Sequence, residues 1–307
     1  MKSNTLDKEY EASLKSIETE NYIDRKFYRP IGFRIAKSLC GTGITPNMVT
    51  IISIFVGAAA GPLFYYDNIY LVVLGILSLI IANILDCVDG QLARLSGIKS
   101  KIGRILDGLA GDIWFTLIYV FIALRLNNEF GTRLFFIPAV LAGISHLIQA
   151  NITDYYKTLH LYFVSREKGS EFQSLDELRS QYNEMKPGAG KVLFFLYLGY
   201  TSIQEAFTPK LQAFLKYLRT TYGGNIPDNI QENFRHQSKC LMKNYLDLLT
   251  FNGRSILLFL TVLTGYVWIY LFYEIVILNI ILVISIHKYE KICLFNGKLN
   301  GELRVES

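Results

Sequence analysis

Apolar and charged segments alternate along the chain, and six apolar runs stand out. They lie near residues 48–66, 69–85, 113–124, 135–152, 255–273 and 275–286, and the third extends backwards through the segment ILDGLAGD. A membrane-spanning helix needs about 20 predominantly apolar residues. The pattern therefore predicts an all-α, polytopic membrane protein with six transmembrane helices, in which Tyr273 and Glu274 form the turn between the last two.

Composition supports the membrane class. Hydrophobic residues make up 51% of the 307 residues and charged residues 19%, whereas a soluble domain has about 25% charged residues. The chain is also too apolar to be disordered. The four cysteines, at positions 40, 87, 240 and 293, form no CxxC pair and no regular framework, which argues against a disulfide scaffold and a structural zinc site.

The distribution of Lys and Arg predicts the orientation of the helices. These residues number 31. They gather before the first apolar run, between the second and third, after the fourth and in the C-terminal tail, and none lies between the first and second or the fifth and sixth. Because cytoplasmic loops are enriched in them, we expect both termini and every large loop on the cytoplasmic side of a cytoplasmic (inner) membrane. The first 47 residues also lack the apolar core of a secretory signal.

Four segments follow from this pattern. Residues 1–47 form a cytoplasmic or interfacial segment, in which 24–39 is an amphipathic helix lying in the membrane interface; the alternative is a soluble helix packed on cytoplasmic loops. Residues 48–160 hold transmembrane helices one to four. Residues 161–248 form a cytoplasmic helical insert, and 249–307 hold the last two transmembrane helices and the tail.

The insert carries its own helix signals. They are a capping box at Ser174 and Glu177, a stop before Pro187, a start at Thr208 and Pro209, a stop at Gly223 and a cap at Asp228. The apolar segment 191–200 is too short to span a membrane, so we expect it to be interfacial or buried. Three roles stay open for the insert: it shapes a headgroup pocket, covers the active site or forms a subunit contact.

Carboxylates gather where the second and third apolar runs meet the cytoplasm. Residues 86–112 read DCVDGQLARLSGIKSKIGRILDGLAGD, which places Asp86 and Asp89 at the end of one helix and Asp107 and Asp112 at the start of the next. Ionisable residues at membrane depth indicate function by default. Carboxylates this close stay ionised only if cations neutralise them, and such hard oxygen ligands select Mg²⁺, Mn²⁺ or Ca²⁺. A pair of these ions is typical of sites that clamp a diphosphate.

The spacing of these residues resembles a known family. Seven residues fit the pattern D-x2-D-G-x2-A-R-x8-G-x3-D, namely Asp86, Asp89, Gly90, Ala93, Arg94, Gly103 and Asp107. This pattern is the signature of CDP-alcohol phosphotransferases (CDP-alcohol phosphatidyltransferases), integral membrane enzymes that make phospholipids by displacing CMP. The segment TPNMVT, from Thr45 to Thr50, is also similar to the family's entry into its first span.

The resemblance implies a role for each matched residue. Asp86, Asp89 and Asp107 would ligate two Mg²⁺ or Mn²⁺ ions, Gly90 and Ala93 would line the cytidine pocket, Gly103 would belong to the same nucleotide site, and Arg94 would position the N-terminal segment and the nucleotide phosphates. The alternative is a set of helix caps and salt bridges with Arg94, Lys99, Lys101 and Arg104. The resemblance also implies a homodimer in membrane lipid, with a CDP-activated alcohol such as CDP-diacylglycerol, a hydroxyl acceptor and no nucleic-acid partner.

One position departs from the family pattern. The fourth aspartate, taken in the family to be the base that deprotonates the attacking hydroxyl, would fall on Gly111, and the carboxylate here is Asp112. On an α-helix Asp112 is rotated by about 140° from Asp107. Three hypotheses stay open: a π-bulge near Gly108 and Gly111 turns Asp112, the candidate base, inward; another group is the base; or the protein binds the nucleotide without ordinary catalysis.

The acceptor would be recognised at the cytoplasmic ends of the later helices. Lys157, Arg254 and Lys288 are candidates to converge on a phosphorylated acceptor such as inositol phosphate or glycerol phosphate; alternatively, these cations only follow the orientation rule. A CDP-polyol donor with a ceramide-like hydroxyl acceptor, as in sphingolipid synthesis, is a further hypothesis. We expect His146 to be hydrogen-bonded between helices.

Together these observations predict a metal-dependent transferase of phospholipid biosynthesis, which moves a substituted phosphate group from a CDP-alcohol to a hydroxyl and releases CMP. An ion-coupled transporter is the first alternative. It would need further ionisable groups deep in other spans and discontinuous helices, and the sequence predicts neither. A non-catalytic membrane scaffold is the second, and in it metal-dependent nucleotide binding would survive changes at Asp86 or Asp107.

Overall fold

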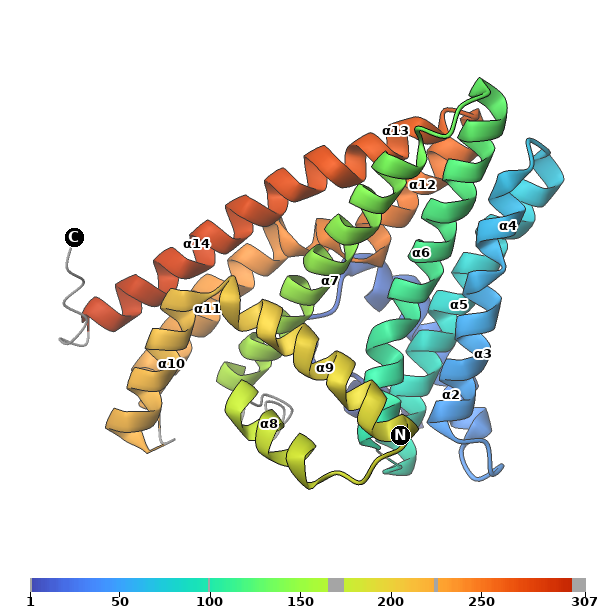
Figure 1. The fold of residues 1–307 in the computed structure, drawn as a ribbon. Coiled ribbons are helices and arrows are strands. Elements are labelled where there is room, and N and C mark those ends of the chain that lie inside the picture. Colours follow the sequence, from blue (N-terminus) through green and yellow to red (C-terminus); the bar gives the residue numbers. More distant parts are fainter. Residues whose placement is uncertain (1, 99, 165–173, 224–225, 300–307) are drawn as a thin grey trace. The chain divides into compact units, whose positions relative to one another are not determined.

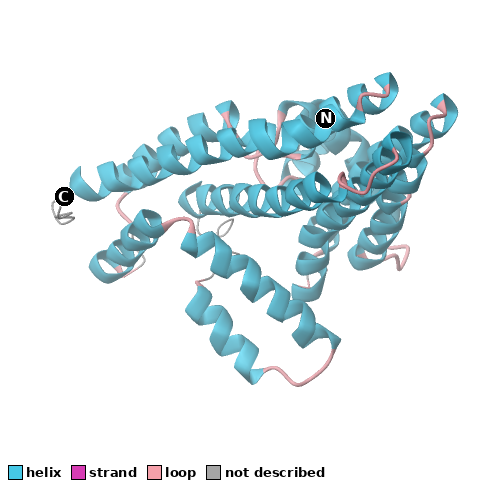
Figure 2. Ribbon diagram, turned by 45° about the horizontal axis from the view of Figure 1, so that its top comes forward, coloured by secondary structure: helices cyan, strands magenta, loops and turns pink. Residues whose placement is uncertain are grey.

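The computed structural model describes residues 2–98, 100–164, 174–223 and 226–299. Helices, turns and loops account for all of these residues, and none of them forms a strand (Figure 2). The chain divides into two compact units. Unit 1 comprises Met1–Leu147 and Phe251–Ile277, and unit 2 comprises Ile148–Thr250 and Leu278–Ser307.

Unit 1 is a bundle of long helices with short N-terminal helices packed on it (Figure 1). Its elements are α1 (Lys2–Ser13), the π-helical turn η1 (Asp24–Tyr28), α2 (Arg29–Leu39), α3 (Pro46–Ala58), α4 (Ala60–Tyr65), α5 (Ile69–Ser96), α6 (Lys101–Phe130), the first part of α7 (Phe136–Val164), α12 (Phe251–Thr264), α13 (Val267–Phe272) and the π-helical turn η3 (Tyr273–Ile277). Helices α3 and α4 contact both α5 and α6.

Polar caps and glycines set the ends of these helices. The Thr45 side chain caps α3, Asn68 caps α5, and Ser100 caps α6. Each offers an oxygen to a backbone N–H that has no partner within its own helix. Helices α5 and α6 end at Gly97 and Gly131, whose φ angles of 71° and 61° are in the left-handed region that glycine tolerates.

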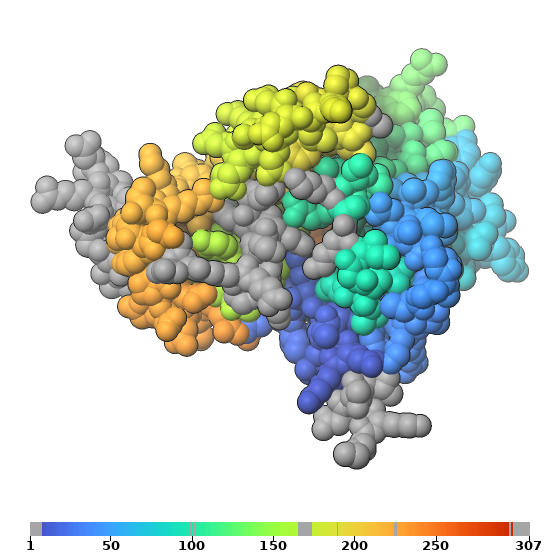
Figure 3. Space-filling model, turned by 90° about the horizontal axis from the view of Figure 1, so that it is seen from below, coloured from blue at the N-terminus to red at the C-terminus, as the bar shows by residue number. Residues whose placement is uncertain are grey.

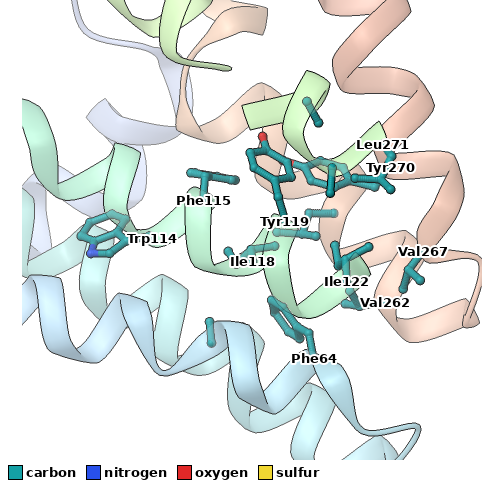
Figure 4. Close-up of a cluster of buried hydrophobic side chains, with 14 of the residues drawn as sticks. Phe64, Trp114, Phe115, Ile118, Tyr119, Ile122, Val262, Val267, Tyr270 and Leu271 are labelled. Carbon is teal, nitrogen blue, oxygen red and sulfur yellow. The ribbon is translucent and has the colours of Figure 1, made fainter. Parts of the chain in front are cut away.

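Aromatic side chains fill the centre of unit 1. Phe64, Trp114, Tyr119 and Tyr270 are at most 2% exposed. Figure 4 shows Tyr119 beside Tyr270, and their stacked rings have centroids 6.0 Å apart. A Cβ atom on Gly57 of α3 would lie 2.5 Å from the Trp114 ring. Small residues at such crossings allow close approach between membrane helices.

The predicted amphipathic segment 24–39 is helical and packs on α5. Phe33 on its inner face is buried, and Asn252 Nδ2 of α12 donates a 2.8 Å hydrogen bond to Asp24. Burial raises the pKa of Tyr28 to about 12, with a further rise from the charge of Asp24, so this hydroxyl stays protonated. The segment is therefore docked on unit 1, and its position in a membrane interface stays a prediction.

Five helices are long and apolar enough to cross a membrane. They are Pro46–Tyr65, Ile69–Ser96, Ile102–Phe130, Phe136–Val164 and Val267–Leu294, and Phe251–Thr264 is a shorter apolar helix. The prediction of an all-α, polytopic membrane protein agrees with these helices. The predicted count of six transmembrane helices is not confirmed.

The predicted turn at Tyr273 and Glu274 is wrong. The helix break lies instead at Gly265, whose φ is 81°, between α12 and α13. Glu274 lies inside η3 and is fully buried. A charged residue within an apolar run suggested the turn, but Arg254 donates a hydrogen bond to Glu274, so this carboxylate is accommodated inside the protein.

Unit 2 contains the rest of α7 together with the insert and the last helix. Its other elements are α8 (Leu175–Glu184), α9 (Ala189–Ala206), α10 (Pro209–Tyr222), α11 (Asp228–Asn244), the 3-10 turn η2 (Leu246–Leu249) and α14 (Leu278–Leu299). The predicted capping box at Ser174 and Glu177 is confirmed. Gly223 ends α10 with a φ of 55°, which confirms the predicted stop.

Two predicted caps in the insert are corrected. Asp228 is the first residue of α11, and Pro227 occupies the cap position. Thr208 precedes α10 as predicted, but its hydroxyl donates to the Gln204 carbonyl, 2.7 Å away. The start of α10 is capped by Glu290 of α14, which accepts hydrogen bonds from the backbone N–H groups of Lys210 (2.8 Å) and Leu211 (3.1 Å). A cap from a distant helix has no local sequence signal.

Helix α9 attaches to α7 and exposes an apolar face. Asn151 Nδ2 of α7 donates a 2.9 Å hydrogen bond to the Tyr200 carbonyl of α9. Val192, Phe195 and Leu196 on α9 are 63%, 61% and 51% exposed. With 18 residues, α9 is shorter than the about 20 residues that a span requires. Its predicted interfacial position stays a prediction.

Candidate metal centre

Three carboxylates come together where α5 ends and α6 begins. Asp86 and Asp89 lie one turn apart on α5, and Asp107 lies in the second turn of α6. One ligand oxygen from each lies within 4.8 Å of the others. The connection after Gly97 is short, and it therefore returns the chain to the same end of the bundle. Asp89 is buried and Asp107 is exposed, so the cluster is open to a ligand on one side.

A hydroxyl from α3 holds one of these carboxylates. Thr50 Oγ1 lies 2.6 Å from Asp89 Oδ2 and donates a hydrogen bond to it. Thr50 is itself only 2% exposed, and the cap at Thr45 fixes the start of its helix. The sequence singled out the segment TPNMVT but assigned Thr50 no contact with the carboxylates. The segment itself was the sequence signal near this contact. The contact could not be predicted from it, because Thr50 and Asp89 lie 39 positions apart in the sequence.

Two glycines of the motif allow close packing around the cluster. A Cβ atom on Gly103 would lie 2.2 Å from Asn47 Oδ1 and 2.8 Å from Ser100 Oγ, so a larger residue would displace these two side chains. A Cβ atom on Gly90 would lie 3.2 Å from a guanidinium nitrogen of Arg94. Both glycines thus have packing roles, and their contact with a nucleotide, like that of Ala93, stays a prediction.

Arg94 and its neighbour Gln91 tie the N-terminal segment to α5. Arg94 Nε donates a hydrogen bond to the backbone carbonyl of Ser13, and Gln91 Nε2 donates one to the Ser13 hydroxyl at 3.0 Å. On the face of unit 1 seen in Figure 3, the N-terminal segment lies beside the α5–α6 connection. Arg94 therefore contacts the N-terminal segment. Its contact with nucleotide phosphates stays a prediction.

The cluster fits a hard divalent cation. It offers three carboxylates and no thiol or imidazole among the grouped ligands, the set that Mg²⁺ and Mn²⁺ prefer over softer metals. Three negative charges within 4.8 Å repel one another unless a cation or protons neutralise them. The Thr50 hydroxyl supports Asp89 from the protein side, as outer groups commonly orient ligating carboxylates.

Comparison with known proteins identifies this region. Residues 43–168 match the family model of CDP-alcohol phosphatidyltransferases. These residues form a CDP-alcohol phosphatidyltransferase domain. The match confirms the family resemblance of the motif. An archaetidylinositol phosphate synthase of Pyrococcus horikoshii is 45% identical over 74 residues, which are 24% of this chain and 38% of that relative. The matched stretch thus spans well under half of the relative.

Asp112 of the transferase domain lies outside this carboxylate group. Helix α6 is α-helical from Lys101 to Phe130, so the hypothesis of a π-bulge near Gly108 and Gly111 is wrong. A regular helix turns Asp112 away from Asp107 by about 140°. Its side chain is buried, and Oδ1 lies 3.6 Å from His146 Nε2. A role for Asp112 as the base stays a prediction.

The three candidate acceptor residues have partners within their own units. In unit 1, Arg254 is 1% exposed and is bound to Glu274 and His146. In unit 2, Lys157 Nζ lies 3.9 Å from Asp247 Oδ1, and Lys288 Nζ donates a 2.8 Å hydrogen bond to the Tyr245 hydroxyl. The convergence of these three cations on an acceptor phosphate stays a prediction.

Proposed function

We propose that this protein is a membrane transferase that depends on a divalent metal, moves a substituted phosphate group from a CDP-activated alcohol to a hydroxyl acceptor and releases CMP. The observation that carries the proposal is the meeting of Asp86, Asp89 and Asp107 within a CDP-alcohol phosphatidyltransferase domain. Phospholipid headgroup synthesis is the class of reaction that fits this domain in a chain with five apolar helices of spanning length.

The chain's own residues supply the binding and the proton acceptor. Asp86, Asp89 and Asp107 would hold two Mg²⁺ or Mn²⁺ ions, with Asp89 oriented by Thr50. Bound ions would stabilise the charge that grows on the departing CMP. The acceptor oxygen forms a bond to the phosphorus that carries the donor alcohol, and the bond from that phosphorus to the CMP oxygen breaks. Asp112 or a substitute would take the acceptor's hydroxyl proton.

The substrates follow from the relative and the cations. The relative's name states that it makes an archaetidylinositol phosphate, which favours a phosphorylated polyol such as inositol phosphate as the acceptor here. Lys157 and Lys288 of unit 2 are the residues that we propose to recognise the acceptor phosphate, whereas Arg254 is buried and bound to Glu274. CDP-diacylglycerol or a related CDP-lipid would be the donor. Glycerol phosphate and a ceramide-like hydroxyl are the other acceptors to compare.

We propose that the metal centre and both termini lie on the cytoplasmic side of a cytoplasmic membrane, because the Lys-rich and Arg-rich connections mark that side. Helix α12 has 14 residues and rises about 21 Å, which is short of the about 30 Å hydrocarbon core. It would be the sixth span only if flanking residues complete the crossing. Helix α9 would lie in the interface with its apolar face in the lipid, and the family resemblance favours a homodimer.

One observation favours the transporter alternative. The expectation that no further ionisable group lies deep in other spans is wrong, because His146, Arg254 and Glu274 are at most 4% exposed. Intramembrane groups of this kind occur in ion pathways. Arg254 and Glu274 are paired with each other, however, and the domain match favours the enzyme. Proton flux into protein-containing vesicles, with no CMP release, would support the transporter.

The direct test is CMP release by the purified full chain in detergent, with Mg²⁺ or Mn²⁺, CDP-diacylglycerol and each acceptor in turn. We expect release that requires both metal and acceptor. Asp107→Asn should abolish it, and Asp176→Asn, which changes an exposed carboxylate on α8, should not. Two results together would refute the transferase and support the scaffold. CMP would be released from no pair of donor and acceptor, and metal-dependent CDP-lipid binding would survive Asp107→Asn.

A further inference from the structure

A second group of ionisable side chains lies buried inside unit 1. Asp112 comes from α6, His146 from α7, Arg254 from α12 and Glu274 from η3. They are 7%, 4%, 1% and 0% exposed. Ionisable groups inside a membrane helix bundle are costly and persist where they pair with one another. Four such groups from four segments therefore form a built site rather than a chance contact.

Contacts run in a chain from Glu274 to Asp112. Arg254 is ion-paired with Glu274, and its Nη1 lies 2.7 Å from His146 Nδ1. On the other side of the imidazole, His146 Nε2 lies 3.6 Å from Asp112 Oδ1. The Tyr119 hydroxyl lies 3.1 Å from the same Nδ1. The two ring nitrogens of His146 thus face different partners.

The chemistry of these partners favours one tautomer of the imidazole. Arg254 Nη1, at 2.7 Å, is closer to Nδ1 than Glu274 Oε1, at 3.7 Å. Because a guanidinium has only hydrogen-bond donors, the closer contact favours Nδ1 as an acceptor. The proton of neutral His146 is then on Nε2, which faces Asp112. Glu274 balances the charge of Arg254, and the Phe115 ring packs against the imidazole, with centroids 4.7 Å apart and planes 31° apart. In this tautomer Asp112 faces the protonated Nε2 of an imidazole whose ring packs against Phe115.

We propose that His146 is a positioning residue for Asp112, and that Arg254 with Glu274 holds His146 in the tautomer that donates to Asp112. This inference rests on the proposed function with Asp112 as the base. When the acceptor oxygen bonds to phosphorus and CMP leaves, the acceptor's O–H bond breaks and its proton passes to the Asp112 carboxylate. His146 keeps its own proton throughout. The imidazole would thus fix a carboxylate that lies one position away from the family's spacing.

Two substitutions at His146 distinguish the loss of its hydrogen-bond donor from the loss of its packing. His146→Leu keeps a similar volume without a donor, and His146→Gln keeps an N–H donor near the place of Nε2. We expect His146→Leu to lower kcat about 10–100-fold, the usual effect of removing an orienting partner, with KM for the CDP-alcohol and metal-dependent CDP-alcohol binding unchanged. His146→Gln should restore most of the activity. His236→Leu, an exposed position on α11, is the matched control.

Combining the change with Asp112→Asn tests whether the two residues act as a unit. Asp112→Asn should lower kcat about 10²–10⁴-fold, as loss of a general base does, and His146→Leu should then add nothing. The positioning role would be overturned if the two substitutions lowered kcat by the product of their separate effects, or if His146→Leu raised KM by as much as it lowered kcat. Failure of His146→Gln to restore kcat would also overturn it. Full activity in Asp112→Asn would overturn it too, without touching the transferase itself.

A measurement without turnover keeps the inference separate from the proposed function. Nitrogen NMR of the histidine-labelled full chain in micelles reports which imidazole nitrogen carries the proton. His146 should carry it on Nε2, and Arg254→Met should release this preference. A proton on Nδ1 in the unchanged protein would overturn the inference whether or not CMP is released. A wild-type chain with the Nε2 proton but no CMP release from any pair would overturn the proposed function alone.

Discussion

The buried pair of Arg254 and Glu274 should make a large and strongly coupled contribution to folding. Both side chains are at most 1% exposed. Glu274→Gln leaves the guanidinium buried without its counter-charge, and breaking such a pair costs about 3–5 kcal/mol. Arg254→Met leaves the carboxylate in the same position and should cost a similar amount. Against a total stability of about 5–15 kcal/mol, either change would remove a substantial share.

The double variant Arg254→Met with Glu274→Leu is the informative one. It removes both charges and fills the space with apolar side chains, an exchange that is commonly neutral or stabilising by about 1–4 kcal/mol. The two single losses add to about 6–10 kcal/mol, so the double variant should recover most of that sum. Glu177→Gln, in an exposed pair with Arg219, is the control and should cost less than about 1 kcal/mol.

Equilibrium unfolding in mixed micelles with increasing SDS measures these differences. Trp114 lies in the core of unit 1. In a Trp268→Phe background, which removes the second of the chain's two tryptophans, its fluorescence follows the loss of the packing around the pair. Each single variant should unfold at a clearly lower SDS fraction than the wild type. The double variant should unfold at nearly the same SDS fraction as the wild type. A Glu274→Gln variant as stable as the wild type, or a double variant as weak as the sum of the singles, would refute the reasoning.

Three further predictions concern the transferase domain. Thr50→Val should weaken Mn²⁺ affinity about 10–100-fold in calorimetric titration, whereas Thr50→Ser keeps the hydroxyl and should not. Gly103→Ala should lower Tm, because a Cβ there meets an oxygen at 2.2 Å, while Gly108→Ala, with no atom within 4 Å of its Cβ, should gain up to about 1 kcal/mol. Moving the carboxylate by Gly111→Asp with Asp112→Gly should lower CMP release to the level of Asp112→Asn, and wild-type release would contradict a role for position 112.

Local sequence patterns predicted what neighbours along the chain determine. The capping box at Ser174 and Glu177 joins residues three positions apart, and the spacing of Asp86 and Asp89 puts two carboxylates on one turn of one helix. A short connection then brings Asp107 to the same end of the bundle, which the position of the apolar runs already implied. These features depend on helix periodicity and short loops, which a single sequence shows directly.

Contacts between distant helices account for the errors. The turn at Glu274 was predicted because an isolated carboxylate is costly in an apolar run. Its partner Arg254 lies 20 positions away in sequence, and nothing local shows that they pair. The hydrogen bond from Thr50 to Asp89 spans 39 positions, and the cap from Glu290 to α10 spans about 80. The π-bulge hypothesis failed for a related reason. It assumed that Asp112, the candidate base, must turn inward, whereas a partner on α7 lies beside it in a regular helix.

Helix α6 carries residues of two different polar groups. Asp107 faces the exposed carboxylate group, and Asp112 faces the buried His146. Five residues of a regular helix separate them by about 140° and a rise of about 7.5 Å, and the cap at Ser100 fixes where this helix begins. Under the proposed function, Asp112 as the proton acceptor and Asp107 as a metal ligand keep a constant separation, because one rigid helix carries both. Movement of α6 would therefore shift both together, whereas His146 lies on another helix and can adjust Asp112 independently of Asp107.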